Sequence, residues 1–253
     1  MATETLFKEN PEDILRSLPD TGLLLGIDEA GRGAVLGPLV VAGVFIQKKD
    51  LPLLLEISPS DSKTFGSGLK AQETRACLST HISQLFQTVV VKVPSCAVDR
   101  WVRGKGLNAL EVACARSIIT RVPCVDWVMA DGARLFSPLC RELKFFHAEN
   151  RADETFPLVS AASIVAKDER DRSMNAICRH YLPNFGVIGG GGYANKKTAA
   201  FLKSHFAAYK RLPSEVRFSW NWSVIQDLSL SKPPSFFQSS LFSPTRLRED
   251  IDD

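Results

Sequence analysis

The chain has 253 residues, of which 45% are hydrophobic and 23% are charged, and its formal net charge at pH 7 is +3. These proportions are typical of a globular protein, and no apolar run approaches the roughly 20 residues that span a bilayer. Because the net charge is small, composition alone does not indicate nucleic-acid binding. Any basic surface must therefore be local.

The N-terminal sequence MATETLFKENPEDILRSL is acidic and lacks the basic segment and apolar core of a signal peptide. The six cysteines form no C-x-x-C pair and no zinc-type spacing, and most of them stand beside apolar residues. We therefore expect buried thiols in a reducing compartment. The expected location is the cytoplasm, or the nucleus if the source is eukaryotic.

Residues 1–20 are expected to form a polar leader with one short amphipathic helix. Five short apolar runs rich in β-branched residues then predict strands at 23–28, 39–45, 88–93, 125–130 and 143–148. Helices are predicted at 69–86, 106–121, 157–180 and 195–209. This order favours an α/β fold, a sheet with some antiparallel hairpins and with helices on its faces.

The predicted domain covers residues 21–227, and its C-terminal helices occupy about 195–227. Residues 228–253 are rich in serine and proline, end acidic and show no periodicity. Such a composition is typical of a disordered tail.

The strongest chemical signal is GIDEAGRG at residues 26–33. Here a strand delivers Asp28 and Glu29 into a turn that contains Gly31 and Gly33. Because consecutive strand residues face opposite sides, we expect the strand to end at these acids if both serve one site. The glycines permit such a turn and let backbone N–H groups approach a ligand.

Two further acids follow predicted strands. Asp131 ends one apolar run and precedes a glycine, and Asp153 comes just after the fifth strand. Since ligands collect where the carboxyl ends of strands meet, these acids are expected to join Asp28 and Glu29. Asp168 lies about 22 Å further along a helix, too far to share a metal with the residues at its start.

The helix after Asp153 carries two other features. Small residues at Ala161, Ala162 and Ser163 should let it pack closely against the sheet. Asp168 and Glu169 are expected to form a solvated face of this helix.

Clustered carboxylates without nearby histidine or cysteine suit hard cations such as Mg²⁺ or Mn²⁺ rather than Zn²⁺. Two such ions, roughly 3.5–4 Å apart, can activate water and stabilise the leaving oxygen in phosphodiester cleavage. The sequence therefore predicts a metal-dependent nuclease.

Six segments together resemble ribonuclease HII and the related catalytic subunit of eukaryotic type 2 ribonuclease H: GIDEAGRG, DSK at 61–63, ADG at 130–132, RAD followed by VSAASIVAK at 151–167, GGGGY at 189–193 and RFSW at 217–220. The resemblance covers about residues 22–222. It implies the ribonuclease H fold, a five-stranded mixed sheet flanked by helices, with a C-terminal helical appendage. It also implies cleavage of RNA–DNA hybrids and of duplex DNA at single embedded ribonucleotides.

The implied metal ligands are the four carboxylates Asp28, Glu29, Asp131 and Asp153. The resemblance further implies a turn that senses the ribose 2′-hydroxyl, a tyrosine that packs on the sugar next to the scissile phosphate, and three side chains that contact phosphate. These are Gly31, Arg32 and Gly33 for the turn, Tyr193 for the sugar, and Lys63, Asn108 and Arg170 for phosphate. The sequence departs from the family pattern at Ala34, where proline is usual, and after Tyr193, where it has ANKK.

Two other functions are compatible with part of this pattern. A DNA-cutting nuclease or recombinase could use the same carboxylates, but it needs no 2′-hydroxyl sensor. A catalytically silent hybrid-binding module would not need all four acids. We expect a monomer, although RFSW resembles the archaeal and eukaryotic form and the D-G at Asp131 resembles the bacterial one, so a subunit of a hetero-oligomer stays open.

The tail contains one further motif, Gln238-Ser239-Ser240-Leu241-Phe242. It resembles the pentapeptide with which bacterial replication and repair proteins bind the sliding clamp, and we expect a contact through Gln238, Leu241 and Phe242. The alternative is a chance match, because short motifs often occur by chance in a Ser- and Phe-rich segment.

Overall fold

The computed structural model describes residues 10–57, 68–122 and 124–230. Lys63 and the motif with Gln238, Leu241 and Phe242 therefore lie outside the described residues. None of the helices in the described part of the chain is long and apolar enough to cross a membrane.

Five strands form one sheet in the order β3-β2-β1-β4-β5. The bounds are β1 (Leu23–Ala30), β2 (Leu39–Gln47), β3 (Gln87–Val93), β4 (Trp127–Asp131) and β5 (Phe146–Glu149). β2 runs antiparallel to both β1 and β3, whereas β1, β4 and β5 are parallel to one another. The expected five-stranded mixed sheet is confirmed, with strand ends that differ from the predicted ones by up to three residues.

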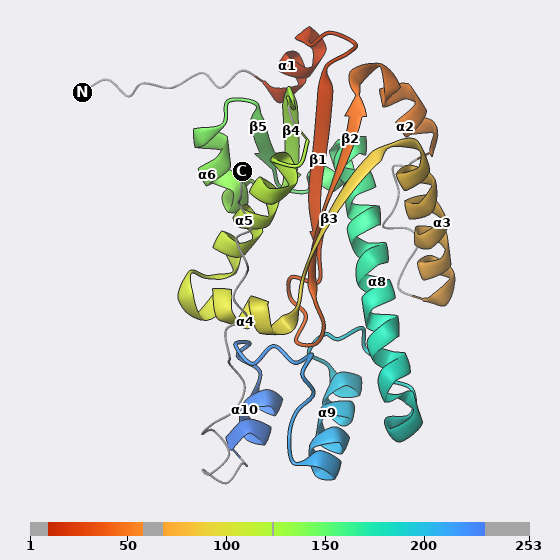
Figure 1. Cartoon of the computed structure of the whole chain (residues 1–253), viewed down its shortest axis with the longest axis vertical. Helices are drawn as coiled ribbons and strands as arrows, with labels where there is room; N and C mark the ends of the chain where they lie inside the picture. The colour runs from red at the N-terminus through yellow and green to blue at the C-terminus, as the bar shows by residue number, and fades with distance from the viewer. Residues whose placement is uncertain (1–9, 58–67, 123, 231–253) are drawn as a thin grey trace, which may run out of the picture.

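Helices cover both faces of the sheet (Figure 1). One face is covered by α8 (Pro157–Phe185), with α3 (Leu69–Leu85) and α2 (Leu51–Ile57) beside it. The other face carries α4 (Ser95–Gly104), α5 (Leu107–Ile119) and α6 (Ala133–Glu142). The helices predicted near α3, α5 and α8 are confirmed, but α4 and α6 were not predicted.

Side chains of β1 alternate between two cores. Leu24 packs in the core formed with α8, and Leu25 and Ile27 pack in the core formed with α5. This alternation continues along the strand, because successive side chains point to opposite faces. Asp28 therefore belongs to the α8 side of the sheet, and Glu29 belongs to the α5 side.

The first turn of α8 lies directly against β1 at Gly26. A Cβ atom there would collide with the main chain of Leu158 and lie 2.8 Å from the nitrogen of Val159. Ala161 and Ala162 continue this contact and are fully buried. The expected close packing of this helix is confirmed, and it requires a glycine on the strand as well as small residues on the helix.

The two ends of the described chain add smaller packed parts. In the expected polar leader, α1 (Pro11–Ser17) places Ile14 and Leu15 against the α8-side core. At the other end, α9 (Lys196–Tyr209) and α10 (Ser223–Leu230) form a third core with Tyr181 and the loop around Leu36. This is the expected helical appendage, and α10 extends three residues beyond the predicted boundary at residue 227.

Two predictions about burial are wrong. Asp168 is only 4% exposed, because its helix face lies beside α3, and its Oδ2 pairs with Nη2 of Arg172 at 2.8 Å. Of the six cysteines, which are all free thiols, only Cys114 is buried, and three are exposed. Apolar neighbours in sequence did not identify the buried thiols, because helix periodicity places adjacent residues on different faces.

Candidate active site

The carboxyl end of β1 is open on one side. Pairing of β1 with β4 stops at Ile27 and Ala130, whereas pairing with β2 continues to Ala30. The prediction that the strand ends at its two acids is therefore wrong for the β2 side. The acids can still serve one site, because β4 ends beside them and leaves that side of β1 uncovered.

Asp28 is the most deeply buried of the four predicted metal ligands, with 5% of its surface exposed. Its Oδ1 accepts a hydrogen bond from the backbone N–H of Glu29 at 2.7 Å. Burial raises the pKa of Asp28 well above its ordinary value, and the negative charge of Glu29 raises it further. Ser163 and Lys167 of α8 offset only part of this rise in pKa.

Glu29 lies on the α5 side with a second buried glutamate. Burial and the charge of Glu111 raise the pKa of Glu29 to about 7, Asp131 adds to the rise, and Arg32 opposes it. Its Oε2 is buried and has no hydrogen-bond partner among the described residues. A buried acceptor in this state is costly unless something else binds it.

Asp131 is hydrogen-bonded to Ala152, the residue that precedes Asp153. Oδ1 of Asp131 accepts from the backbone N–H of Ala152 at 2.9 Å, and this residue begins α7 (Ala152–Thr155). Asp153 is the next residue along the chain and is half-buried. The chain turns away from Asp131 at Gly132, whose φ of 106° favours glycine. Asp153 thus directly follows a residue whose backbone is held beside the end of β4.

This set of side chains fits a hard divalent cation. All its donors are carboxylate oxygens, the ligands that Mg²⁺ and Mn²⁺ prefer. The raised pKa values of Asp28 and Glu29 and the unpartnered Oε2 of Glu29 indicate negative charge that a cation would stabilise. Within the described ranges no three histidine, cysteine, aspartate or glutamate side chains already converge on one point as a formed cation site.

The turn after Glu29 is built around Gly31, which has a φ of 83°. A Cβ atom on this residue would collide with the side chain of Arg170 and lie 2.9 Å from the oxygen of Pro38. Gly33 is exposed, with nothing near its Cβ position. The predicted glycine requirement thus has a packing cause at Gly31, and Gly33 leaves the main chain accessible.

Arg32, predicted for the turn, and Asn108, predicted for phosphate contact, lie together. Nη1 of Arg32 pairs with Oε2 of Glu111, and its Nη2 donates to Oδ1 of Asn108 at 2.6 Å. Asn108 is exposed at the start of α5. Two nitrogens of the Arg32 guanidinium are therefore bonded to protein acceptors.

Arg170, which was predicted to contact phosphate, is only 4% exposed. Its Nη2 donates to the carbonyls of Leu36 at 3.2 Å and Gly191 at 3.1 Å. Its guanidinium also lies 5.4 Å from the ring centre of Tyr193, which is 47% exposed. The Arg170 guanidinium therefore packs against the ring of Tyr193.

Two residues of this region were missed by the sequence analysis. Glu111 interrupts the apolar pattern of the predicted helix at 106–121 and is fully buried, and burial raises its pKa to about 7. Arg217 is also fully buried, and burial lowers its pKa to about 10. A charged residue at a core position of an otherwise apolar helix was the available signal for Glu111. Arg217 opens the RFSW segment that resembles the family, but nothing in the sequence indicated its burial or a role for its side chain.

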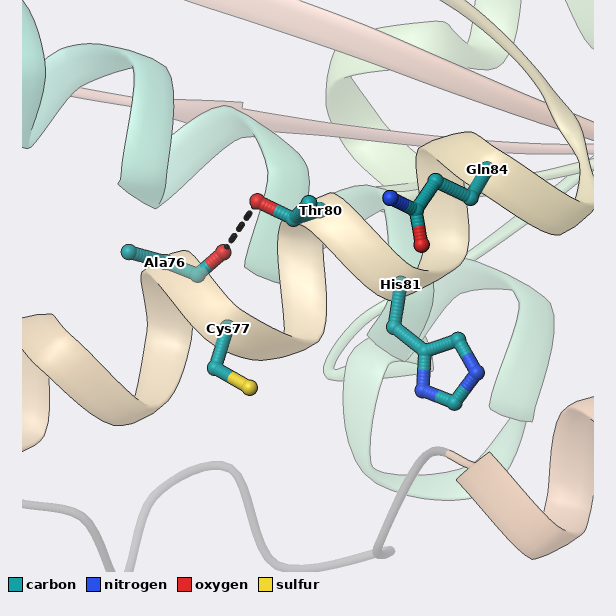
Figure 2. A pocket seen from close by; sticks show the side chains of 5 residues that line it. All are labelled: Ala76, Cys77, Thr80, His81 and Gln84. Atoms are coloured by element: carbon teal, nitrogen blue, oxygen red, sulfur yellow. Dashed lines mark hydrogen bonds between the residues drawn. The ribbon is translucent and has the colours of Figure 1, made fainter.

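A surface hollow elsewhere is unrelated to these carboxylates. It has a volume of about 510 Å³ and is lined by Ala76, Cys77, Thr80, His81 and Gln84, all on α3 (Figure 2). Its lining includes no aspartate, glutamate or arginine. We assign it no role.

Comparison with known proteins places the chain in a family. The family model described as Ribonuclease HII matches residues 25–223. Ribonuclease HII of Methanocella arvoryzae is 36% identical over 219 residues, which cover 82% of this chain and 93% of the relative.

Two solved structures agree with this match. The ribonuclease H2 of Pyrococcus horikoshii superposes with a TM-score of 0.70 at 27% identity, covering 82% of this chain and 97% of that one. The RNase HII of Archaeoglobus fulgidus, solved as a complex with PCNA, gives a TM-score of 0.67 at 36% identity, covering 79% and 96%.

The fold and these matches define an endoribonuclease of the ribonuclease H class, which cuts RNA–DNA hybrids. Within that class, the chain belongs to the ribonuclease HII family. The prediction of an enzyme is thereby confirmed over the alternatives of a DNA-cutting nuclease and a silent binding module.

Replacing Asp28 by asparagine should stabilise the protein in the absence of divalent metal. When the pKa of a carboxyl group is raised in the folded state, the protein loses stability as the pH rises through that pKa. The variant should therefore unfold at a higher temperature than the wild type at about pH 8, by roughly 3 °C or more, since 1 kcal/mol shifts Tm by about 2–4 °C in a domain of this size. Calorimetry in EDTA should show the difference shrinking toward about pH 4. A lower Tm for Asp28→Asn at pH 8 would contradict the assigned burial of like charges.

Proposed function

We propose that this enzyme cuts RNA–DNA hybrids and duplex DNA containing a single ribonucleotide by metal-dependent hydrolysis, leaving 5′-phosphate and 3′-hydroxyl ends. The observation that carries the proposal is the burial of Asp28 beside Glu29 at the open end of β1. Placing two like charges in a poorly solvated position is unfavourable without a cation. A role in removing ribonucleotides and clearing hybrids or primers from DNA would follow.

Asp28, Glu29, Asp131 and Asp153 would hold Mg²⁺ or Mn²⁺, with two ions in the active complex. When bound, the ions activate the attacking water and stabilise the leaving oxygen. The protein contributes fixed positions for the carboxylates. The hydrogen bond from Ala152 holds Asp131, and burial against α8 holds Asp28.

Selection of the sugar is proposed for the turn and for Tyr193. Gly33 leaves the main chain of the turn accessible next to Glu29, where backbone groups can meet a 2′-hydroxyl. Tyr193 presents an exposed ring that is supported by Arg170. Such a ring can pack on the sugar beside the cut phosphate and so favour an RNA-to-DNA junction.

The purified chain, acting alone as a monomer, should cut a duplex with one embedded ribonucleotide on the 5′ side of that ribonucleotide when Mg²⁺ is added. Asp131→Asn should lower this rate by at least about 100-fold, because loss of a charged ligand costs more than the 10–100-fold typical of a ligand's supporting partner. Gel analysis of end-labelled duplex measures both results. Glu142→Gln, on the exposed surface of α6, is the control and should cut normally. Near-full activity of Asp131→Asn, or activity in EDTA, would exclude the proposed site.

Tyr193→Ala should reduce junction cleavage more than cleavage of a long uniform hybrid. The reason is that only the junction requires one sugar to be selected, whereas a uniform hybrid offers a ribonucleotide at every register. The ratio of kcat/KM for the two substrates measures this selectivity. Equal losses on both substrates would leave Tyr193 with a packing role only.

We also propose that residues 238–242 bind the sliding clamp of the source organism. The proposal is supported by the relative from A. fulgidus, which was solved in complex with PCNA. A peptide of residues 231–253 should bind the clamp weakly, because ordering a free segment costs conformational entropy. Calorimetric titration should detect this binding and its loss when Leu241 and Phe242 are both replaced by alanine. Binding that survives the double replacement, or no binding at all, would refute the motif.

A further inference from the structure

Buried charged side chains contact both the side chain and the main chain of Arg32. Its guanidinium pairs with Oε2 of Glu111 on α5, and its backbone carbonyl accepts a hydrogen bond from Nη1 of Arg217 at 3.1 Å. Glu111 and Arg217 are both 0% exposed. Two fully buried charges of opposite sign thus meet one residue of the turn that follows Glu29.

Arg217 also fixes the far end of the same turn. Its Nε donates to the carbonyl of Gly37 at 3.0 Å, and its guanidinium lies 4.9 Å from the ring centre of Trp220. The backbone N–H of Arg217 donates to the carbonyl of Val35 at 2.9 Å. The segment from Arg32 to Gly37 is therefore anchored at its start, middle and end.

Stability alone does not account for this arrangement. A buried ion pair is often no more stabilising than apolar side chains of the same volume, because both charges must be removed from water. Here the protein replaces only some of the lost hydrogen bonds to water, since Oε1 of Glu111 and Nη2 of Arg217 have no hydrogen-bond partner among the residues that the structure describes. The neighbours of Glu111 on α5, such as Leu110 and Ala115, pack in an apolar core.

We propose that Glu111 and Arg217 are positioning residues that hold the Gly31–Gly33 turn for contact with the ribose. The inference rests on the proposed function, in which this turn senses the 2′-hydroxyl. Arg32 then serves as an anchor of the turn, because its Nη1 and Nη2 are bonded to Glu111 and Asn108. A turn displaced by about 1 Å would misalign the scissile phosphate and could cost about 100-fold in rate.

The first test is a double-mutant cycle on activity with Arg32→Ala and Glu111→Gln, using the single-ribonucleotide duplex at saturation. Each single variant should lower kcat by about 10- to 100-fold. If Glu111 acts through Arg32, adding Glu111→Gln to Arg32→Ala should change kcat by less than about twofold. Multiplicative losses would show that Glu111 acts independently of Arg32 and would overturn the proposal.

The second test is the same cycle on thermal stability in EDTA, which does not depend on activity. In the wild type, the pairing with Arg32 offsets part of the unfavourable burial of the Glu111 carboxylate, so Glu111→Gln should raise Tm only slightly. In the Arg32→Ala background that offset is lost, so Glu111→Gln should raise Tm by clearly more. The matched control is Glu142→Gln. It breaks an exposed pair with Arg116 of α5, the helix that also carries Glu111, and should alter neither readout.

The two tests separate the possible failures. A wild-type chain that does not cut the ribonucleotide duplex, combined with the expected larger rise in Tm in the Arg32→Ala background, would refute the proposed function and leave the anchoring of Arg32 intact. A chain that cuts normally but shows the same Tm change for Glu111→Gln in both backgrounds would refute the anchoring.

Arg217→Lys keeps the charge but loses the forked contacts to Arg32 and Gly37, so it should also lower kcat at temperatures well below its Tm. Wild-type kcat in this variant would refute the role of Arg217.

Discussion

The burial of like charges at the carboxyl end of β1 is the constraint on which the rest of the site depends. Asp28 and Glu29 are adjacent in sequence and point to opposite faces of the sheet, so two different helices must accommodate them. Their mutual repulsion favours movement apart and into water. The fold prevents this movement by packing α8 against β1 at Gly26, where only a glycine leaves enough space for the helix main chain.

The same constraint explains why the site needs support from distant parts of the chain. β4 stops beside the acids, which exposes one side of β1 but removes the hydrogen bonds that would otherwise hold it. The turn after Glu29 replaces them with contacts to Arg170 and Arg217, which come from α8 and from the segment before α10. Catalytic groups must be held within fractions of an ångström, and such supporting contacts provide that rigidity. The C-terminal appendage is therefore part of the site's construction.

Much of this arrangement could be predicted from sequence, because it depends on local signals. Apolar β-branched runs predicted all five strands. They also predicted that Asp131 ends one strand and that Asp153 follows another. Side-chain burial was harder to predict, since it depends on which helices meet. Asp168 was expected in solvent and lies beside α3, while Arg170 was expected at phosphate and lies beneath Tyr193. Arg217 was noted only as part of the RFSW segment, and its contacts could not be predicted, because its partners are backbone carbonyls far away in sequence.

The central claim is that the carboxylates at the end of β1 hold the divalent ions that cleavage requires. Anomalous diffraction from crystals soaked in Mn²⁺, at a concentration that supports cleavage in solution, tests this claim most directly. The account predicts ordered Mn²⁺ within about 2.0–2.3 Å of oxygens from Asp28, Glu29, Asp131 or Asp153, as expected for hard cations. Ordered Mn²⁺ only at other positions, or none at these carboxylates, would contradict it.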